Sequence, residues 1–385
     1  MTRHLNISDI REAARRRLPK AFFEFLDRGT EDEEAMVANR AALSALRLKP
    51  AVLKDVRRID TSTDILGRKS PLPFAIAPTG SAGMLAWRGE LAVARAAGRA
   101  GIPYTLATSS TSTIEEIAAV ATGGMWLQLY VWDDREASLE IVDRAARAGA
   151  EALLITVDTP VMANREYNER NGFSFPVKPR PLLVADILSH PRWFAGVLAK
   201  YWMTGGMPHY ANYPRAMSGP VTQAPPRRAN SASVTWDDIG RFRDRWRGKL
   251  VLKGVLDPAD AVRAADIGAD AVVVSNHGGR MFDAAPSSIE ALPGVVAAAG
   301  DRLDVLFDGG IRRGTDIMRA LALGARAVLI GRAPLYGVAA EGEAGVARVI
   351  EILADELERS MALAGTTSVG AISRDCIWCS QPTNG

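Results

Sequence analysis

The chain has 385 residues, a length that one large barrel domain with insertions can use. Its 47 lysine and arginine side chains nearly balance 44 aspartate and glutamate side chains, which excludes a strong basic field, so we expect no nucleic-acid partner. No apolar signal-peptide core follows the first methionine, and no run of about 18 apolar residues could span a bilayer, so we expect a cytoplasmic protein.

Residues 1–60 are predicted to form a helical preface. Pro19 suits the start of a helix, and Gly29 suits the end of one. The apolar side chains between these two residues are the expected packing face: Phe22, Phe23, Phe25 and Leu26.

Apolar runs of strand length begin at residue 72 and occur eight times. They alternate with alanine-rich stretches of helical periodicity, most of which end near a glycine. This alternation predicts a (β/α)8 TIM barrel, with residues 1–385 as a single domain; a doubly wound open sheet is the alternative. The predicted strands are Leu72–Ala77, Ile102–Ala107, Met125–Val131, Ala152–Val157, Leu250–Val255, Ala271–Val274, Asp304–Phe307 and Ala327–Ile330.

The alternation is interrupted after the fourth predicted strand. Residues 160–248 exceed the length of one crossover, so residues 176–235 are expected to form a lid insertion. An amphipathic helix inside it either packs on the barrel mouth or, with Arg192 and Lys200 beside it, lies on a membrane surface through residues 190–205. The apolar residues of that helix are Phe194, Val197, Leu198, Tyr201 and Trp202.

Polar side chains stand where the predicted strands end. All carboxyl ends of a parallel barrel meet at one mouth, where catalytic residues gather. His277 and Arg280 follow the sixth strand and combine a proton-transfer group with an anion-binding guanidinium, although a lone histidine often has only a structural role. The other residues at or near strand ends are Pro78, Thr79, Gly80, Thr108, Gln128, Tyr130, Thr156, Asp158, Arg165 and Lys253.

Glycine-rich turns follow the last two predicted strands. Arg312 and Arg332 stand beside these turns, where such barrels commonly bind a phosphate through backbone N–H groups. A phosphorylated cofactor or substrate is therefore expected. Lys253 and Gln128 could hydrogen-bond the polar edge of a flat ring system, where the lysine would stabilise developing negative charge.

The two cysteines, Cys376 and Cys379, form a single C-x-x-C pair near the C-terminus. No second pair completes a zinc site, so no metal is expected. A solvent-exposed tail is the favoured interpretation, with redox use as the alternative.

Three segments occur in the order 128–130 (QLY), 275–280 (SNHGGR) and 308–314 (DGGIRRG). With these motifs the chain resembles the FMN-dependent 2-hydroxy-acid dehydrogenase and oxidase family, which includes glycolate oxidase, L-lactate dehydrogenase and mandelate dehydrogenase. The similarity extends from Leu18 to beyond Arg332. The resemblance implies FMN as cofactor, a small 2-hydroxy acid such as lactate or mandelate as substrate, a quinone or similar electron acceptor, and a homotetramer.

The resemblance also implies roles for single residues. His277 matches the base that takes a proton from the substrate, and Asp158 matches the carboxylate that stabilises the resulting imidazolium. Arg280 and Arg165 match the pair that binds the substrate carboxylate. Tyr130 matches a tyrosine near the substrate hydroxyl.

The remaining implied positions contact the flavin. Lys253 corresponds to the residue beside the flavin N1 and O2 atoms. Two positions depart from the family pattern: Phe25 replaces a tyrosine that binds the substrate carboxylate, and Ala107 replaces a serine, for which Thr108 could substitute. The other flavin positions are Pro78, Thr79, Gly80, Gln128, Thr156, Ser275, Asp308, Gly309, Gly310, Arg312, Gly331 and Arg332.

Gly80 bears on the electron acceptor, because family members with glycine here tend to be dehydrogenases and those with alanine tend to be oxidases. A dehydrogenase is therefore expected, with an oxygen-using oxidase as the alternative. A second alternative is a diphosphate-binding isomerase with the same fold. Such an enzyme would not need His277, Asp158 and Arg280 together, so the sequence argues against it. A flavin-binding protein without turnover is the more distant alternative.

Overall fold

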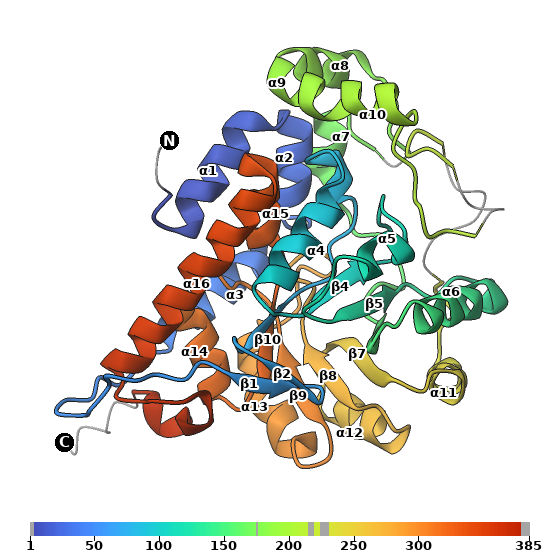
Figure 1. Cartoon of the computed structure of the whole chain (residues 1–385). Helices are drawn as coiled ribbons and strands as arrows, with labels where there is room; N and C mark the ends of the chain where they lie inside the picture. The colour runs from blue at the N-terminus through green and yellow to red at the C-terminus, as the bar shows by residue number, and fades with distance from the viewer. Residues whose placement is uncertain (1–3, 175, 215–218, 224–230, 379–385) are drawn as a thin grey trace.

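The computed structural model describes residues 4–174, 176–214, 219–223 and 231–378. Eight parallel strands form a closed barrel in the order β10-β3-β4-β5-β6-β7-β8-β9, which confirms the predicted TIM barrel (Figure 1). The strands are short and almost wholly buried, as expected for strands enclosed by helices. They are β3 (Phe74–Ile76), β4 (Tyr104–Ala107), β5 (Met125–Leu129), β6 (Ala152–Thr156), β7 (Lys249–Val255), β8 (Ala271–Val274), β9 (Asp304–Phe307) and β10 (Ala327–Ile330).

The barrel interior is filled by side chains from alternate strand positions, among them Trp126, Leu154 and Val273. An antiparallel hairpin of β1 (Thr63–Ile65) and β2 (Arg68–Ser70) packs Ile65 and Leu66 against this cluster. Because Arg68 of the hairpin pairs with Glu151, just before β6, the hairpin covers the amino-terminal end of the barrel. The opposite end is therefore the one open to a ligand. Nothing in the sequence pattern pointed to this hairpin.

Helices surround the barrel. One α-helix follows each of β3, β4, β5, β7, β8 and β9, α11 precedes β7, and two α-helices follow β10; a short 3-10 helix at Ala82–Met84 also lies between β3 and its α-helix. Most begin at a polar cap and turn an apolar face to the strands, as in α6, whose first turn is capped by Asp134. The helices are α4 (Gly89–Arg99), α5 (Ile114–Ala118), α6 (Arg135–Arg147), α11 (Trp236–Arg245), α12 (Pro258–Asp266), α13 (Ser288–Ala299), α14 (Gly314–Ala322), α15 (Arg332–Glu341) and α16 (Glu343–Leu363).

The N-terminal preface is helical, as predicted, and consists of α1 (Ile7–Arg17), α2 (Lys20–Asp27) and α3 (Glu34–Ala45). Figure 1 shows α1 lying beside α15 and α16 along one flank. Phe22, Phe23 and Leu26 are buried, whereas Phe25 is only partly buried and reaches the site described below.

The insertion after β6 contains α7 (Glu166–Arg170), α8 (Pro181–Leu188), α9 (Pro191–Trp193), a π-helical turn (Phe194–Leu198) and α10 (Ala199–Thr204). The carboxylate of Asp186 accepts hydrogen bonds from the first backbone N–H groups of α2, so α8 is fixed to the preface. The predicted 176–235 boundary includes residues 215–218 and 224–230, which lie outside the described residues.

The predicted apolar stripe of the insertion is divided between two faces. Val197 is buried and Tyr201 packs against the core, but Trp202 is 55% exposed and is not part of the packing face, and neighbouring Met203 is 76% exposed. A π-helical turn interrupts the regular helical spacing here, and the ring of Trp202 contacts that of Phe194, with centroids 5.8 Å apart. None of the described helices is long and apolar enough to cross a membrane.

The expectation of an exposed C-terminal cysteine was wrong for Cys376. This residue is 7% exposed, and its carbonyl accepts a hydrogen bond from Lys49 N, because the chain bridges back to the segment after α3. Cys379 lies outside the described residues.

Candidate active site

The predicted strand-end residues converge at the open mouth of the barrel. His277 follows β8, and its Nδ1 lies 3.1 and 3.2 Å from the two carboxylate oxygens of Asp158, which follows β6. A bulge in β7 makes this approach possible: Gly254 has φ +106°, and a Cβ there would lie 2.4 Å from Asp158 Cγ. Glycine is therefore required at 254 for the His277–Asp158 pair to form.

The backbone of His277 is held in an unusual conformation. Its φ is +57°, in the left-handed region that non-glycine residues rarely adopt. Its N–H donates to Ser275 Oγ at 3.0 Å, and the next turn is fixed by a reciprocal side-chain amide pair between Asn276 and Asn39 of α3. Such strained residues concentrate at functional sites. The role of Asn39 was not predicted from sequence.

The charges in the mouth favour an ionised Asp158. Burial alone would raise the pKa of Asp158, but the charge and hydrogen bond of His277, together with the positive charge of Lys253, lower it below 3.8. Asp158 therefore stays negative at neutral pH, with both carboxylate oxygens within hydrogen-bond reach of His277 Nδ1.

Lys253 on β7 is 4% exposed, and its Nζ lies 2.8 Å from Asp308 Oδ2 and 3.1 Å from Ser275 Oγ. Burial would lower the pKa of Lys253, but the carboxylates of Asp308 and Asp158 raise it overall. A permanent positive charge is thus held inside the mouth. The second carboxylate oxygen of Asp308, Oδ1, is buried and has no hydrogen-bond partner among the described residues.

Gln128, Thr108 and Thr156 form a buried hydrogen-bonded group across β4, β5 and β6. Gln128 Nε2 donates to Thr156 Oγ1 at 2.9 Å, and Thr108 Oγ1 donates to the Gln128 carbonyl at 2.6 Å. Thr108 Oγ1 also accepts from Tyr130 N, so this hydroxyl joins two strands. That Thr108 substitutes for the flavin-contacting serine, which is Ala107 in this chain, stays a prediction.

Two guanidinium groups enclose the ring of Phe25. The Cζ atoms of Arg165 and Arg280 lie 5.7 and 5.5 Å from the ring centroid, and Arg165 Nη2 donates to the Arg280 carbonyl. Arg280 also donates to the carbonyls of Phe25, Leu26 and Arg28, at the C-terminal end of α2. Burial first, and the charge of Arg165 second, lower the pKa of Arg280 to about 10, so both groups remain cationic at neutral pH and favour an anionic ligand.

Two tyrosines line the same region. Burial, reinforced by Asp158, raises the pKa of Tyr130, so its hydroxyl keeps its proton at neutral pH. Tyr167 of α7 is 4% exposed, Arg28 packs over its ring at 4.9 Å, and its hydroxyl is buried without a partner in the described chain. Sequence reasoning missed Tyr167; the only available signal was its position two residues after Arg165.

The glycine-rich turns lie beside a cavity of about 490 Å³ whose lining includes Gly278, Gly310, Arg312 and Arg332. Gly309 and Gly310 have φ values of +117° and +84°, which favour glycine. Neither arginine has an ion pair with a carboxylate among the described residues. Burial lowers the pKa of Arg332 to about 10, with a further contribution from the charge of Arg312.

A network from α1 fixes this arginine pair. Asp27 receives hydrogen bonds from Arg11 and from the hydroxyl of Tyr336, and its carbonyl accepts from Arg332. Tyr336 in turn contacts Arg312 through its hydroxyl and its ring. Asp27, Tyr336 and Arg11 were not identified from sequence, because their association depends on helices distant in the chain.

The loop after β3 contains Pro78, Thr79 and Gly80, all partly exposed at the mouth. A Cβ on Gly80 would lie 2.2 Å from Ser109 Oγ, so the space that alanine would need is filled by the Ser109 hydroxyl. Gly331, the residue before α15, lies beside Ala77 and Thr79, which brings this loop next to the turn after β10.

These residues fit a flavin mononucleotide. Two arginines without carboxylate partners suit its phosphate, and the buried Lys253 with the Gln128 amide suits the polar edge of its ring. The unpartnered Asp308 Oδ1 leaves an acceptor for a ligand hydroxyl.

Comparisons with known proteins agree with this geometry. Residues 14–379 match the family model described as FMN-dependent dehydrogenase. An L-lactate dehydrogenase of Caulobacter vibrioides is 42% identical, with 95% of each chain covered, and a putative L-lactate dehydrogenase of Mycobacterium tuberculosis is 41% identical over 96% of this chain and 88% of its own.

Solved structures give the same result. The monotopic membrane protein (S)-mandelate dehydrogenase matches with a TM-score of 0.92 and 39% identity over 98% of this chain and 100% of its own. A mandelate oxidase matches with a TM-score of 0.81 and 40% identity over 96% of this chain and 98% of its own. The chain therefore belongs to the FMN-dependent dehydrogenase family and is an FMN-dependent oxidoreductase of 2-hydroxy acids.

Proposed function

We propose that the enzyme oxidises an (S)-2-hydroxy acid to the 2-oxo acid, with His277 as the base. The observation that supports this most directly is the His277–Asp158 pair at 3.1 Å in the same mouth as the two partly buried guanidinium groups of Arg165 and Arg280. When bound, FMN supplies the two-electron acceptor. Lys253, Gln128 and Thr156 would hold its ring, and Arg312 and Arg332 its phosphate.

The substrate carboxylate is held by Arg165 and Arg280, which fixes the hydroxyl-bearing carbon beside His277. The Nδ1 edge of the imidazole faces Asp158, which leaves Nε2 to take the proton that leaves the substrate. Asp158 then stabilises the imidazolium through a charge-assisted hydrogen bond. Tyr130, still protonated at neutral pH, donates to the substrate oxygen.

Phe25 lacks the hydroxyl that the family uses on the substrate carboxylate. Tyr167 is the candidate replacement, because its hydroxyl is buried, has no partner in the described chain and belongs to the helix that begins directly after Arg165. A Tyr167→Phe variant tests this: KM should rise about fivefold for the loss of one hydrogen bond, with kcat little changed. An unchanged KM would remove Tyr167 from the site.

The substrate is a lactate- or mandelate-like acid. The adjacent rings of Phe25 and Phe173, with centroids 5.3 Å apart, favour an apolar or aromatic substituent on the substrate. The relatives named above act, by their names, on L-lactate and mandelate, so both belong in a first substrate panel.

The electron acceptor is a quinone or similar molecule rather than oxygen, a proposal that rests on Gly80. Peripheral contact with the inner face of the cell membrane, through residues 190–205, is part of the same proposal. It is supported by the exposed side chains of Trp202 and Met203 and by the likeness to a monotopic membrane dehydrogenase. A homotetramer is proposed from the family resemblance alone. The likeness to a mandelate oxidase keeps an oxygen-using oxidase as the second candidate.

One experiment tests both reaction and acceptor. Purified, FMN-loaded protein is mixed anaerobically with L-lactate, (S)-mandelate and their (R)-isomers, and the flavin absorbance is followed. Bleaching by an (S)-acid supports the proposal, and bleaching by none of the panel contradicts it. Reoxidation of the reduced protein faster by a quinone analogue than by air supports the dehydrogenase, whereas the reverse order identifies an oxidase.

A further inference from the structure

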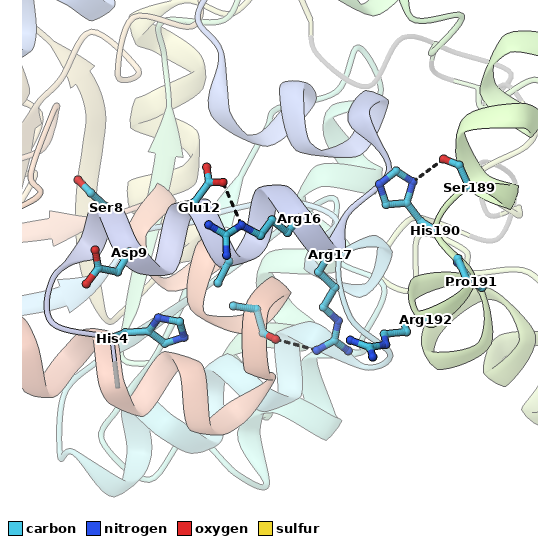
Figure 2. A pocket seen from close by; sticks show the side chains of 12 residues that line it. His4, Ser8, Asp9, Glu12, Arg16, Arg17, Ser189, His190, Pro191 and Arg192 are labelled. Atoms are coloured by element: carbon cyan, nitrogen blue, oxygen red, sulfur yellow. Dashed lines mark hydrogen bonds and ion pairs between the residues drawn. The ribbon is translucent and has the colours of Figure 1, made fainter. Parts of the chain in front are cut away.

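A second cavity lies outside the barrel mouth, between the preface and the insertion. Its volume is about 980 Å³, and its walls come from α1, from residues 189–192 and from Ala340 at the end of α15 (Figure 2). None of its lining residues belongs to the active site described above. Figure 2 shows Arg17 of α1 and Arg192 of α9 on two different walls of this cavity.

Only some of the hydrogen-bond donors of the Arg17 guanidinium group have a partner. Its Nη1 donates to the Ala340 carbonyl at 2.7 Å, but its Nε is buried and has no hydrogen-bond partner within the described residues. Burial lowers the pKa of Arg17, partly offset by the charge of Glu341, which agrees with a guanidinium that no carboxylate contacts directly. A buried donor without a partner is costly unless a ligand or water completes it.

The carboxylates near the cavity are already engaged. Glu12 pairs with Arg15 and Arg16, Asp9 accepts the backbone N–H of Leu5, and Glu341 pairs with His4 at 3.2 Å. Asp186, near His190, caps the first turn of α2. Neither Arg17 nor Arg192 has an ion pair in the described part of the chain, so these two cations are left for an anionic ligand.

We propose that this cavity binds a phosphate ester, with Arg17 and Arg192 as the two guanidinium ligands. A tetrahedral phosphate presents several oxygens to guanidinium forks that approach from different directions. The cavity is far larger than a bare ion, so it also accommodates the organic part of an ester. Leu5 and Leu188, each directly adjacent to a lining residue, are 67% and 64% exposed, so apolar atoms of the ligand would find apolar contacts at the rim.

The phosphate ester has two possible sources, a soluble metabolite or a phospholipid headgroup, and two probes distinguish them. The protein is first loaded with FMN, so that the cofactor's own phosphate site is already filled. Glycerol 3-phosphate is then titrated into it and binding is measured by calorimetry. Separately, sedimentation with phosphatidylcholine vesicles, with and without phosphatidylglycerol, measures lipid binding. Each measurement uses wild type, Arg17→Gln, Arg192→Gln and the charge-matched control Arg241→Gln, an exposed residue of α11 outside the insertion helices.

Arg192 is exposed, so its variant should fold even if Arg17→Gln does not. Affinity for one of the two probes should fall roughly tenfold or more in Arg192→Gln, through loss of a charge-assisted contact, and stay near wild type in Arg241→Gln. A loss confined to glycerol 3-phosphate assigns a soluble ligand, and a loss confined to anionic vesicles assigns a lipid headgroup. Turnover of the hydroxy acid should not change.

Two outcomes would overturn the proposal. One is binding of neither probe, or binding that all three substitutions leave unchanged. The other is an equal loss in the Arg241→Gln control, which would show general attraction to a basic surface without a defined site. Because neither result depends on oxidation of a 2-hydroxy acid, failure here would leave the proposed oxidation reaction untouched.

Discussion

Replacing Asp158 by asparagine removes the charge that opposes the imidazolium of His277 while preserving the shape of the side chain. The two groups are 3.1 Å apart and largely buried. With an effective dielectric constant of about 20, the attraction between unit charges at that distance is about 5 kcal/mol, and a charge-assisted hydrogen bond alone contributes roughly 1.5–3 kcal/mol. Flavin reduction should therefore slow by about 10- to 10⁴-fold.

The assay is anaerobic stopped-flow reduction of the FMN-loaded variant by a saturating (S)-2-hydroxy acid, with the FMN spectrum as evidence that the cofactor is retained. Asp158 has a lowered pKa, so its contribution is present above about pH 4 and is lost only as the pH falls through its folded value. The ratio of the wild-type to the variant rate of flavin reduction should thus be constant across neutral pH. A loss smaller than about fivefold would refute the role assigned to the pair.

Three further changes test other parts of the site. Gly254→Ala would place a Cβ 2.4 Å from Asp158 Cγ at a φ that alanine disfavours, so we expect a lower denaturant midpoint of unfolding and slower turnover. If both values were unchanged, the argument that the β7 bulge requires glycine would be contradicted. Lys253→Met removes a buried cation beside Asp308, so the flavin reduction potential should fall in a redox titration and flavin reduction should slow roughly tenfold or more in stopped flow. An unchanged potential would argue against contact between Lys253 and the flavin ring. Asp27→Asn weakens the hold of Arg11 and Tyr336 on the arginine pair, so apoprotein should bind FMN about tenfold more weakly in a fluorescence titration, whereas wild-type affinity would show that the network is only structural.

The barrel could be predicted from sequence because its signals are local. Buried parallel strands such as Ala271–Val274 are continuous apolar runs, and the intervening helices end at glycines, so each unit is visible within about 30 residues. The hairpin of β1 and β2 gave no such signal, because its three-residue strands are mostly polar and only Ile65 and Leu66 are committed to the core.

The candidate site was predictable only where a strand end or a family motif marked it. His277, Asp158 and Lys253 were identified in this way, and the structure brings them together. The supports of the site depend instead on contacts between distant segments. The Asn39–Asn276 pair joins residues 237 positions apart, and no local pattern indicates it. The π-turn at Phe194–Leu198 likewise gave no local signal, and regular helical spacing alone could not show that Val197 is buried while Trp202 is exposed.

The most direct test of the central claim is single-turnover flavin reduction in His277→Gln. The variant should bind FMN with a normal spectrum, because no cofactor role is assigned to the imidazole, and should lose at least about 10²-fold in the rate of bleaching by the best (S)-2-hydroxy acid. Bleaching at the wild-type rate would contradict the assignment of His277 as the base.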